Sequence, residues 1–383
     1  MHVLRGGHIA DVDGTRRADV AIEGDQIVEV GLDLDGDTET DVSGSVVAPG
    51  LIDAHVHLMM DGRPNVATVR DDSAAEASYR AAANLGAAIE AGVTTVRDLG
   101  APDDVALAAR EAVASGILPG PRVHACGRNI VMTGGHGHWF GREADGPTAV
   151  RTAAREQLKA GADVLKCMAT GGVLTEGAVT GAPELTREEI EALTAAAEPI
   201  GVPTAAHAHG AEGIKNAVKA GISSVEHGTF MDREAAELMS DRGTFWVPTV
   251  SALHGIVDNG VEAGIPVSAV EKAEDAGERM ESAFEHAIDA GVTIAMGTDA
   301  GTPFNFFADI PTEMASMVEQ GLSPSDALEA ATVNGATLLG EDSLGKVQEG
   351  YAADLVVLSA DPHEDVTAWQ EPTHVYKAGD RVV

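Results

Sequence analysis

The sequence predicts an α/β protein: a (β/α)8 TIM-like barrel with a small β-sandwich domain built from both chain termini. Three observations predict it. Apolar, strand-like segments alternate with Ala/Glu-rich helical segments through the middle of the chain. A recurring Ala-Gly pair stands between a helix and the next strand, and the two chain ends share a different, strand-rich character. Regular strand–helix alternation is typical of a parallel sheet covered by helices.

The terminal domain is assigned to residues 1–48 and 342–383. Segments such as "ADVAIEGDQIVEVG" alternate apolar and polar residues between Gly and Asp turns, which is typical of antiparallel strands. The C-terminal segments "ADLVVLSAD" and "HVYKAGDRVV" repeat this pattern. Two similar ends around a different middle therefore predict one composite β-sandwich domain.

The barrel is assigned to residues 49–341. Predicted helices cover 78–92, 149–161 and 186–201, and Gly92, Gly161, Gly221 and Gly291 are expected to cap helices before strands. An open doubly wound sheet is the alternative, but no Gly-rich phosphate loop follows the first strand. The strand candidates are 51–59, 94–100, 122–127, 162–169, 203–210, 223–229, 244–250 and 292–301.

Composition limits the partners of this chain. Its 383 residues are 44% hydrophobic and carry a formal net charge of −36. Such a charge repels nucleic acid and anionic membranes, and it favours a surface adapted to high salt over an ordinary acidic one. Cys126 and Cys167 are the only cysteines, so no disulfide framework is expected. With no apolar stretch suited to secretion or membrane crossing, we expect a cytoplasmic protein.

Ionisable side chains gather where the predicted strands end, which is where such barrels build their active sites. A lone histidine in a strand is more often a hydrogen-bonded core residue than a ligand, and an isolated HxH pair occurs by chance. The coincidence of several such residues at corresponding strand ends is a much stronger signal. Alternate residues of a strand share one face, so both imidazoles of the first strand reach one point. The set is His55, His57, Lys166, His207, His227 and Asp299.

The motifs "PGLIDAHVHL", "LKCMATGG", "AAHAHG", "VEHGT" and "GTDAGTP" resemble the metal-dependent amidohydrolase superfamily. The C-terminal segment "LSPSDALEAATVNGATLLG" and the following "LGKVQEGYAADLVVLSADP" resemble its closing helix and composite β domain. The similarity spans almost the whole chain. Within the superfamily the sequence is most similar to the branch of Xaa-Pro and other Xaa dipeptidases, related to imidazolonepropionases.

This resemblance implies a two-metal centre. His55, His57 and Asp299 would hold one divalent ion, and His207 and His227 the other. A carboxylated Lys166 and a hydroxide would bridge the two ions, which explains a lysine in a buried strand. Imidazole-rich ligation favours Zn²⁺, with Mn²⁺ or Co²⁺ as alternatives. His209 shares a face with His207 and is a competing ligand, whereas Glu226 is expected to point away and form an ion pair in the barrel wall.

The implied reaction is hydrolysis of an amide in dipeptides, Xaa-Pro first, or in N-acyl amino acids. Metal-activated hydroxide would attack while Asp299 shuttles the proton. In the loop "VMTGGHGHWFGRE", His136 is expected to contact the substrate carbonyl and Arg142 is a candidate for its carboxylate. Several dipeptidase relatives carry a tyrosine where this chain has Phe230.

Two alternatives remain open at this level. One is hydrolysis of a cyclic amide of the imidazolonepropionate type, which Lys166 disfavours because that branch lacks the lysine bridge. The other is a barrel without catalysis, kept for binding or assembly, which the complete set of expected ligands disfavours. A homo-oligomer is expected from the aromatic segment "NFFAD".

Overall fold

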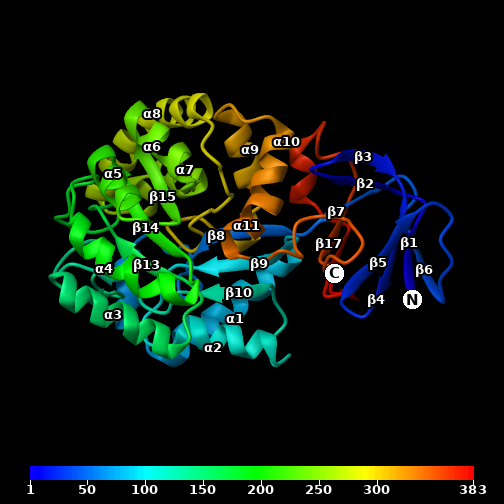
Figure 1. The fold of residues 1–383 in the computed structure, drawn as a ribbon, viewed down its shortest axis with the longest axis horizontal. Coiled ribbons are helices and arrows are strands. Elements are labelled where there is room, and N and C mark those ends of the chain that lie inside the picture. Colours follow the sequence, from blue (N-terminus) through cyan, green and yellow to red (C-terminus); the bar gives the residue numbers. More distant parts are fainter.

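The computed structural model describes residues 1–383 and shows a mixed α/β fold (Figure 1). Strands of the central part lie among helices, whereas the strand-rich part that contains both chain ends lies at one side of the molecule (Figure 1). Central strands pair in parallel, whereas most strand pairs of the terminal part are antiparallel.

The central strands pair in parallel, most of them with a neighbour in sequence. One sheet has the order β10-β9-β8, and the other has the order β12-β11-β13-β14-β15-β16. The short strands β11 and β12 were not predicted. The bounds are β8 (Leu51–Val56), β9 (Val93–Asp98), β10 (Arg122–Ala125), β11 (Ile130–Val131), β12 (Arg142–Glu143), β13 (Leu165–Met168), β14 (Thr204–Gly210), β15 (Ser224–Phe230) and β16 (Phe245–Val247).

The last predicted strand, residues 292–301, is not a regular strand. It makes only single bridges, Trp246 with Ile294 and Val56 with Ala300, so the prediction of a continuous strand is wrong. Side-chain bonds replace part of the ladder here. The buried Asp53 accepts hydrogen bonds from the backbone N and the hydroxyl of Thr298, at 3.2 and 2.6 Å. The segment still joins β8 to β16, because Ala54 N donates to Met296 O and Ala295 N donates to Trp246 O, both at 2.9 Å.

Most connections between the central strands contain a helix. The predicted glycine caps are confirmed, since Gly92, Gly161, Gly221 and Gly291 all have positive φ, from 70° to 93°. The bounds are α1 (Ala74–Glu90), α2 (Val105–Ala114), α3 (Pro147–Ala160), α4 (Arg187–Ala197), α5 (Ala211–Lys219), α6 (Arg233–Arg242), α7 (Val250–Asn259), α8 (Val267–Ala290), α9 (Thr312–Glu319), α10 (Pro324–Glu329) and α11 (Gly335–Leu339). Short 3₁₀ or π turns are η1 (Val66–Asp71), η2 (Glu198–Ile200), η3 (Val261–Ala263), η4 (Phe307–Asp309), η5 (Ala330–Asn334) and η6 (Val366–Gln370).

The terminal part contains two sheets, ordered β5-β4-β1-β6 and β19-β18-β17-β7-β2-β3. Strands from both chain ends meet in the second sheet, where β7 pairs antiparallel with β17. The expectation of antiparallel strands is wrong for two pairs, β1 with β6 and β2 with β7, which are parallel because the chain returns through the other sheet. The bounds are β1 (His2–Arg5), β2 (His8–Asp11), β3 (Gly14–Arg17), β4 (Asp19–Glu23), β5 (Gln26–Gly31), β6 (Thr38–Asp41), β7 (Val46–Pro49), β17 (Leu355–Leu358), β18 (His374–Lys377) and β19 (Asp380–Arg381).

Two separate groups of buried apolar side chains correspond to these two parts. The larger contains 79 residues and includes most of the apolar side chains of the central strands and helices. The smaller contains 13 residues and combines side chains from both chain ends, among them Leu4, Val47, Leu355 and Tyr376. The terminal part therefore depends on both ends of the chain for its core.

The cysteines, the helices and the segment "NFFAD" can each be compared with what the sequence predicts. Cys126 and Cys167 are free and buried, which agrees with the absence of a disulfide framework. None of the helices combines the length and apolar character required to span a bilayer. In "NFFAD", Phe306 is 44% exposed but Phe307 is buried, so only one of these two aromatic side chains is available at the surface.

We predict that Leu355→Ala destabilises the protein. Leu355 is fully buried in the core shared by the two chain ends, so truncation leaves a cavity and lowers the free energy of unfolding by about 2–4 kcal/mol. Urea unfolding in potassium chloride solution measures this change. Leu32→Ala is the control, because Leu32 is 64% exposed, and an equal effect of both changes would contradict the shared core.

Candidate metal centre

His55 of β8 and His57, which immediately follows that strand, meet the carboxylate of Asp299. The two histidines are two residues apart, and both are buried. Their Nε2 atoms lie 3.4 and 3.3 Å from Asp299 Oδ1. The three side chains could hold one metal ion, as the sequence analysis expected.

The backbone at three site residues is unusual. His227, Thr249 and Asp299 have φ values of 68°, 55° and 60°, in the left-handed region that non-glycine residues rarely adopt. Asp299 is held there in part by its backbone N, which donates to the carbonyl of His55 at 2.7 Å. Such conformations cost free energy and often occur at functional sites, where the surrounding structure maintains them.

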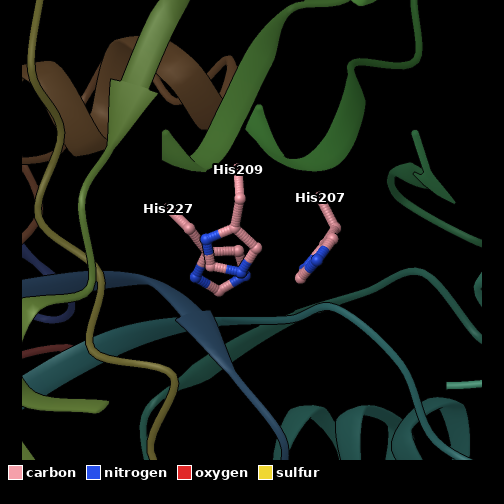
Figure 2. A group of neighbouring side chains, drawn as sticks. All are labelled: His207, His209 and His227. Atoms are coloured by element: carbon pink, nitrogen blue, oxygen red, sulfur yellow. The ribbon is translucent and has the colours of Figure 1, made fainter. Parts of the chain in front are cut away.

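A second group of donors comes from β14 and β15. His207, His209 and His227 present ring nitrogens within 4.8 Å of one another (Figure 2). The rings of His209 and His227 are stacked, with centroids 4.9 Å apart and 14° between their planes, while His207 lies to one side (Figure 2). The structure therefore brings His209 into the same group as the two predicted ligands.

Neighbouring groups orient four of these imidazoles through Nδ1. His57 donates from Nδ1 to the carbonyl of Gly100 at 2.8 Å, so its Nε2 keeps the lone pair that faces Asp299. His209 and His227 pair through Nδ1 with the hydroxyls of Thr229 and Thr249, both at 2.7 Å. These partners were not anticipated, because no spacing in the sequence marks them.

Glu226 has a second role that its position in the sequence does not reveal. Its predicted ion pair in the wall is present, with Arg97 Nη2 3.0 Å from Oε1 and both side chains fully buried. The expectation that Glu226 points away from the site is wrong in one respect, because its Oε2 accepts the Nδ1 hydrogen of His55 at 2.9 Å. Glu226 thereby sets the orientation of a candidate ligand.

Lys166 lies in the wall of the same cavity. Its side chain is almost completely buried in β13, and burial lowers its pKa, while the charges of Glu226 and Asp299 act in the opposite direction. A buried lysine of lowered pKa is more readily deprotonated than one at the surface. The amine of Lys166 is therefore closer to its nucleophilic, neutral form.

The electrostatics suit metal ligands. Burial lowers the pKa of His57 to about 4 and holds the pKa values of His55, His207 and His227 well below the ordinary value, so these imidazoles are neutral donors. Burial also raises the pKa of Asp299 to about 8, although the charge of Lys166 acts in the opposite direction. Asp299 Oδ1 and His207 Nε2 are buried without hydrogen-bond partners, and such atoms are rare in folded proteins. A divalent ion would satisfy them, so the donor set fits a metal.

The donors line a common cavity. His136 also lines it, with its ring centroid 4.3 Å from that of His207 and its Nδ1 unpaired. Close backbone approach is needed at Gly172, where a Cβ would lie 2.5 Å from the His136 ring. The rest of the wall is mainly apolar, from Met60, Trp139, Phe140, Met168, Val173, Leu174, Ala252, Leu253, Ile256 and Met280.

The structure does not bring Arg142 to this site. Its guanidinium pairs with the carboxylate of Glu156, with Nε 2.8 Å from Oε2, and it is absent from the cavity wall. Arg142 is therefore not in a position to make the expected contact with a substrate carboxylate. Although Arg142 follows His136 by only six residues, β12 pairs it with β11 and turns its side chain toward α3.

Comparisons with known proteins identify relatives of this chain. The model of the amidohydrolase family matches residues 46–382. The chain is 33% identical to the ochratoxinase of Aspergillus niger, an alignment that covers 87% of this chain and 75% of the relative. It is 29% identical to the imidazolonepropionase of Cutibacterium acnes, over 90% of this chain and 84% of that protein.

Solved structures give the same result. The crystal structure of a Xaa-Pro dipeptidase with bound methionine superposes with a TM-score of 0.91 and 33% identity, over 99% of this chain and 98% of that one. A prolidase complexed with N-methylphosphonate-L-proline superposes with a TM-score of 0.93 and 31% identity, over 100% and 99% of the two chains. Together with the family match over most of its length, these likenesses show that the chain belongs to the amidohydrolase family.

Proposed function

We propose that this protein is a binuclear metal-dependent amidohydrolase that hydrolyses an amide bond in dipeptides or N-acyl amino acids. The observation that carries the proposal is the convergence of two separate donor groups and Lys166 on one cavity. We also propose a (β/α)8 barrel over residues 49–341 and a sandwich of residues 1–48 and 342–383. The parallel central strands, the bridges of residues 294 and 300 and the shared terminal core support this division.

In this proposal His55, His57 and Asp299 hold one ion, and His207 and His227 hold the other. Lys166 would react through its neutral amine with CO2, releasing a proton and forming a carbamate that would supply anionic oxygen to both ions. The lowered pKa of Lys166 supports this reaction, because only the unprotonated amine is nucleophilic. Imidazole-rich ligation favours Zn²⁺. His209 is then free to contact substrate from beside the second group.

When bound, the metal pair would activate water and polarise the amide carbonyl. The side chains of this chain supply the rest. Asp299 is the only carboxylate in the cavity wall, and we propose that it accepts the proton of the attacking water and returns it to the departing amine. His136, with its unpaired Nδ1, is placed to contact the substrate carbonyl, and the apolar wall excludes water around the side chains of the substrate.

The Xaa-Pro dipeptides are the leading substrate class, supported by the likeness to a Xaa-Pro dipeptidase and a prolidase. The apolar wall suits a hydrophobic first residue. Cyclic amides of the imidazolonepropionate type remain the alternative, given the similarity to an imidazolonepropionase, but Lys166 would then have no ligand role. The strongly acidic composition indicates a protein suited to high salt, so potassium chloride belongs in every assay.

We expect the purified protein to hydrolyse Xaa-Pro dipeptides or N-acyl amino acids in the presence of Zn²⁺, bicarbonate and molar potassium chloride. Asp299→Asn should lower kcat by at least about a hundred-fold, because it removes the proposed proton carrier. Release of the free amine, followed by chromatography, measures both proteins. Equal activity in the two would show that Asp299 is not the proton carrier, and no turnover of any amide would refute the proposed reaction.

Lys166→Ala should reduce the bound metal below two ions per chain. The change removes the only side chain proposed to bridge the two ions, while all five other protein ligands remain. Elemental analysis after dialysis gives the metal content. Lys346→Ala is the control, since Lys346 lies outside the cavity, near Asp13. Two tightly bound ions in the Lys166→Ala protein would contradict the bridge.

Thr249→Val should weaken Zn²⁺ binding by about ten- to a hundred-fold. It removes the hydroxyl that orients His227 through Nδ1, and such partners contribute to metal affinity. Competition with a chromophoric chelator measures the change. Thr244→Val is the matched control, because this buried hydroxyl donates to the carbonyl of Ile222 instead. Similar affinities for all three proteins would exclude an orienting role for Thr249.

A further inference from the structure

Apart from the proposed metal ions, the cavity wall offers no free cationic side chain to the carboxylate of a dipeptide. Lys166 is the only lysine or arginine in its wall, and the proposed function uses that side chain for the metals. A dipeptide or N-acyl amino acid carries a free carboxylate, which needs a cation or strong donors when it leaves water. Phe230 brings no hydroxyl to this task, and Arg142 lies elsewhere.

Helix α8 provides cations beside the cavity. Its residues Lys272 and Arg279 are seven positions apart and so lie on one face of the helix, two turns from each other. Met280, the neighbour of Arg279 in sequence, is buried and lines the cavity wall. Met280 thus places this part of α8 against the cavity, with Arg279 next to it in the chain.

Arg279 is stacked on the aromatic ring at the end of β15. Its Cζ lies 4.9 Å from the centroid of Phe230, a cation–π distance. The Phe230 ring also lies 6.2 Å from that of His209, which lines the cavity. Phe230 is therefore near both His209 and the guanidinium of Arg279, and it gives that guanidinium a flat support.

The remaining contacts of Arg279 leave it available. Its Nη2 lies 3.1 Å from Asp275 Oδ1 one turn back, and these side chains are 58% and 53% exposed. Such an exposed pair contributes little and exchanges easily. Lys272 is less available, because its ammonium donates to the carbonyl of Thr175 at 2.9 Å and so holds the segment that includes Leu174. A planar guanidinium also matches a carboxylate with two parallel hydrogen bonds.

We infer that Arg279, supported by Phe230, binds the free carboxylate of the substrate at the mouth of the cavity and thereby sets specificity for acids over neutral amides. The inference rests on the proposed function, which places the scissile amide at the metals. Arg279, held by Phe230, would then bind the carboxylate in this chain, in place of the tyrosine hydroxyl that several dipeptidase relatives carry at the position of Phe230. The carboxylate would displace Asp275 from the guanidinium.

The test compares Phe-Pro with Phe-Pro amide, which differ only in the carboxylate. In Arg279→Met we expect KM for Phe-Pro to rise about ten- to a hundred-fold, with kcat and the constants for the amide nearly unchanged. Asp275→Asn should lower KM for Phe-Pro, because it frees the guanidinium. Arg233→Met is the matched control, since Arg233 is equally exposed and pairs with Asp289 on the far end of α8.

A second readout keeps this inference distinct from the proposed reaction. Calorimetry of the Zn²⁺-loaded protein with N-acetyl-L-phenylalanine should show weaker binding in Arg279→Met than in the unchanged protein. If no amide is hydrolysed, the proposed reaction fails and this binding difference still decides the role of Arg279. Equal losses for Phe-Pro and its amide, hydrolysis of the amide alone, or unchanged binding of the acid would each overturn the inference.

Discussion

The burial of ionisable side chains at the carboxyl ends of the parallel strands is the constraint on which the rest of this site depends. Lys166, Asp299 and four histidines lose water together, and Asp299 Oδ1 and His207 Nε2 are left without hydrogen-bond partners. Burial lowers the pKa values of Lys166 and His207 and raises that of Asp299, which in each case favours the neutral form. A cavity built in this way attracts divalent ions, since the neutral imidazoles are ready donors and the carboxylate gains the most from a nearby cation.

Hydrogen bonds and an ion pair between neighbouring strands hold these donors in place. Glu226 combines structure and orientation, because its ion pair with Arg97 and its bond to His55 tie β9, β15 and β8 together. Asp53 does the same for β8 and the irregular segment of residues 292–301 through Thr298. Replacing regular ladder bonds with side-chain bonds allows Asp299 its left-handed backbone. The geometry of the donors is thus set largely by residues that are not themselves candidate metal ligands.

The apolar wall and the proposed Arg279 subsite divide substrate recognition between two regions. The metal donors are almost completely buried in the cavity wall, whereas Arg279 of α8 is 58% exposed and lies outside that wall. This separation has a physical advantage, because a guanidinium close to the metal ions would be repelled by them. The exposed pairing of Arg279 with Asp275 also keeps the guanidinium hydrated and mobile until an acid arrives.

The sequence by itself determined the strand and helix order, the glycine caps and the residues at the strand ends, since local periodicity and capping encode them. Within that order, His55, His57 and Asp299 meet as their motifs predicted. Only the tertiary structure decided the rest. It placed Arg142 outside the cavity, joined His209 to the second donor group, gave Glu226 its bond to His55 and stacked Arg279 on Phe230. These contacts join segments distant in sequence, and neither spacing nor propensity specifies how packing turns a side chain.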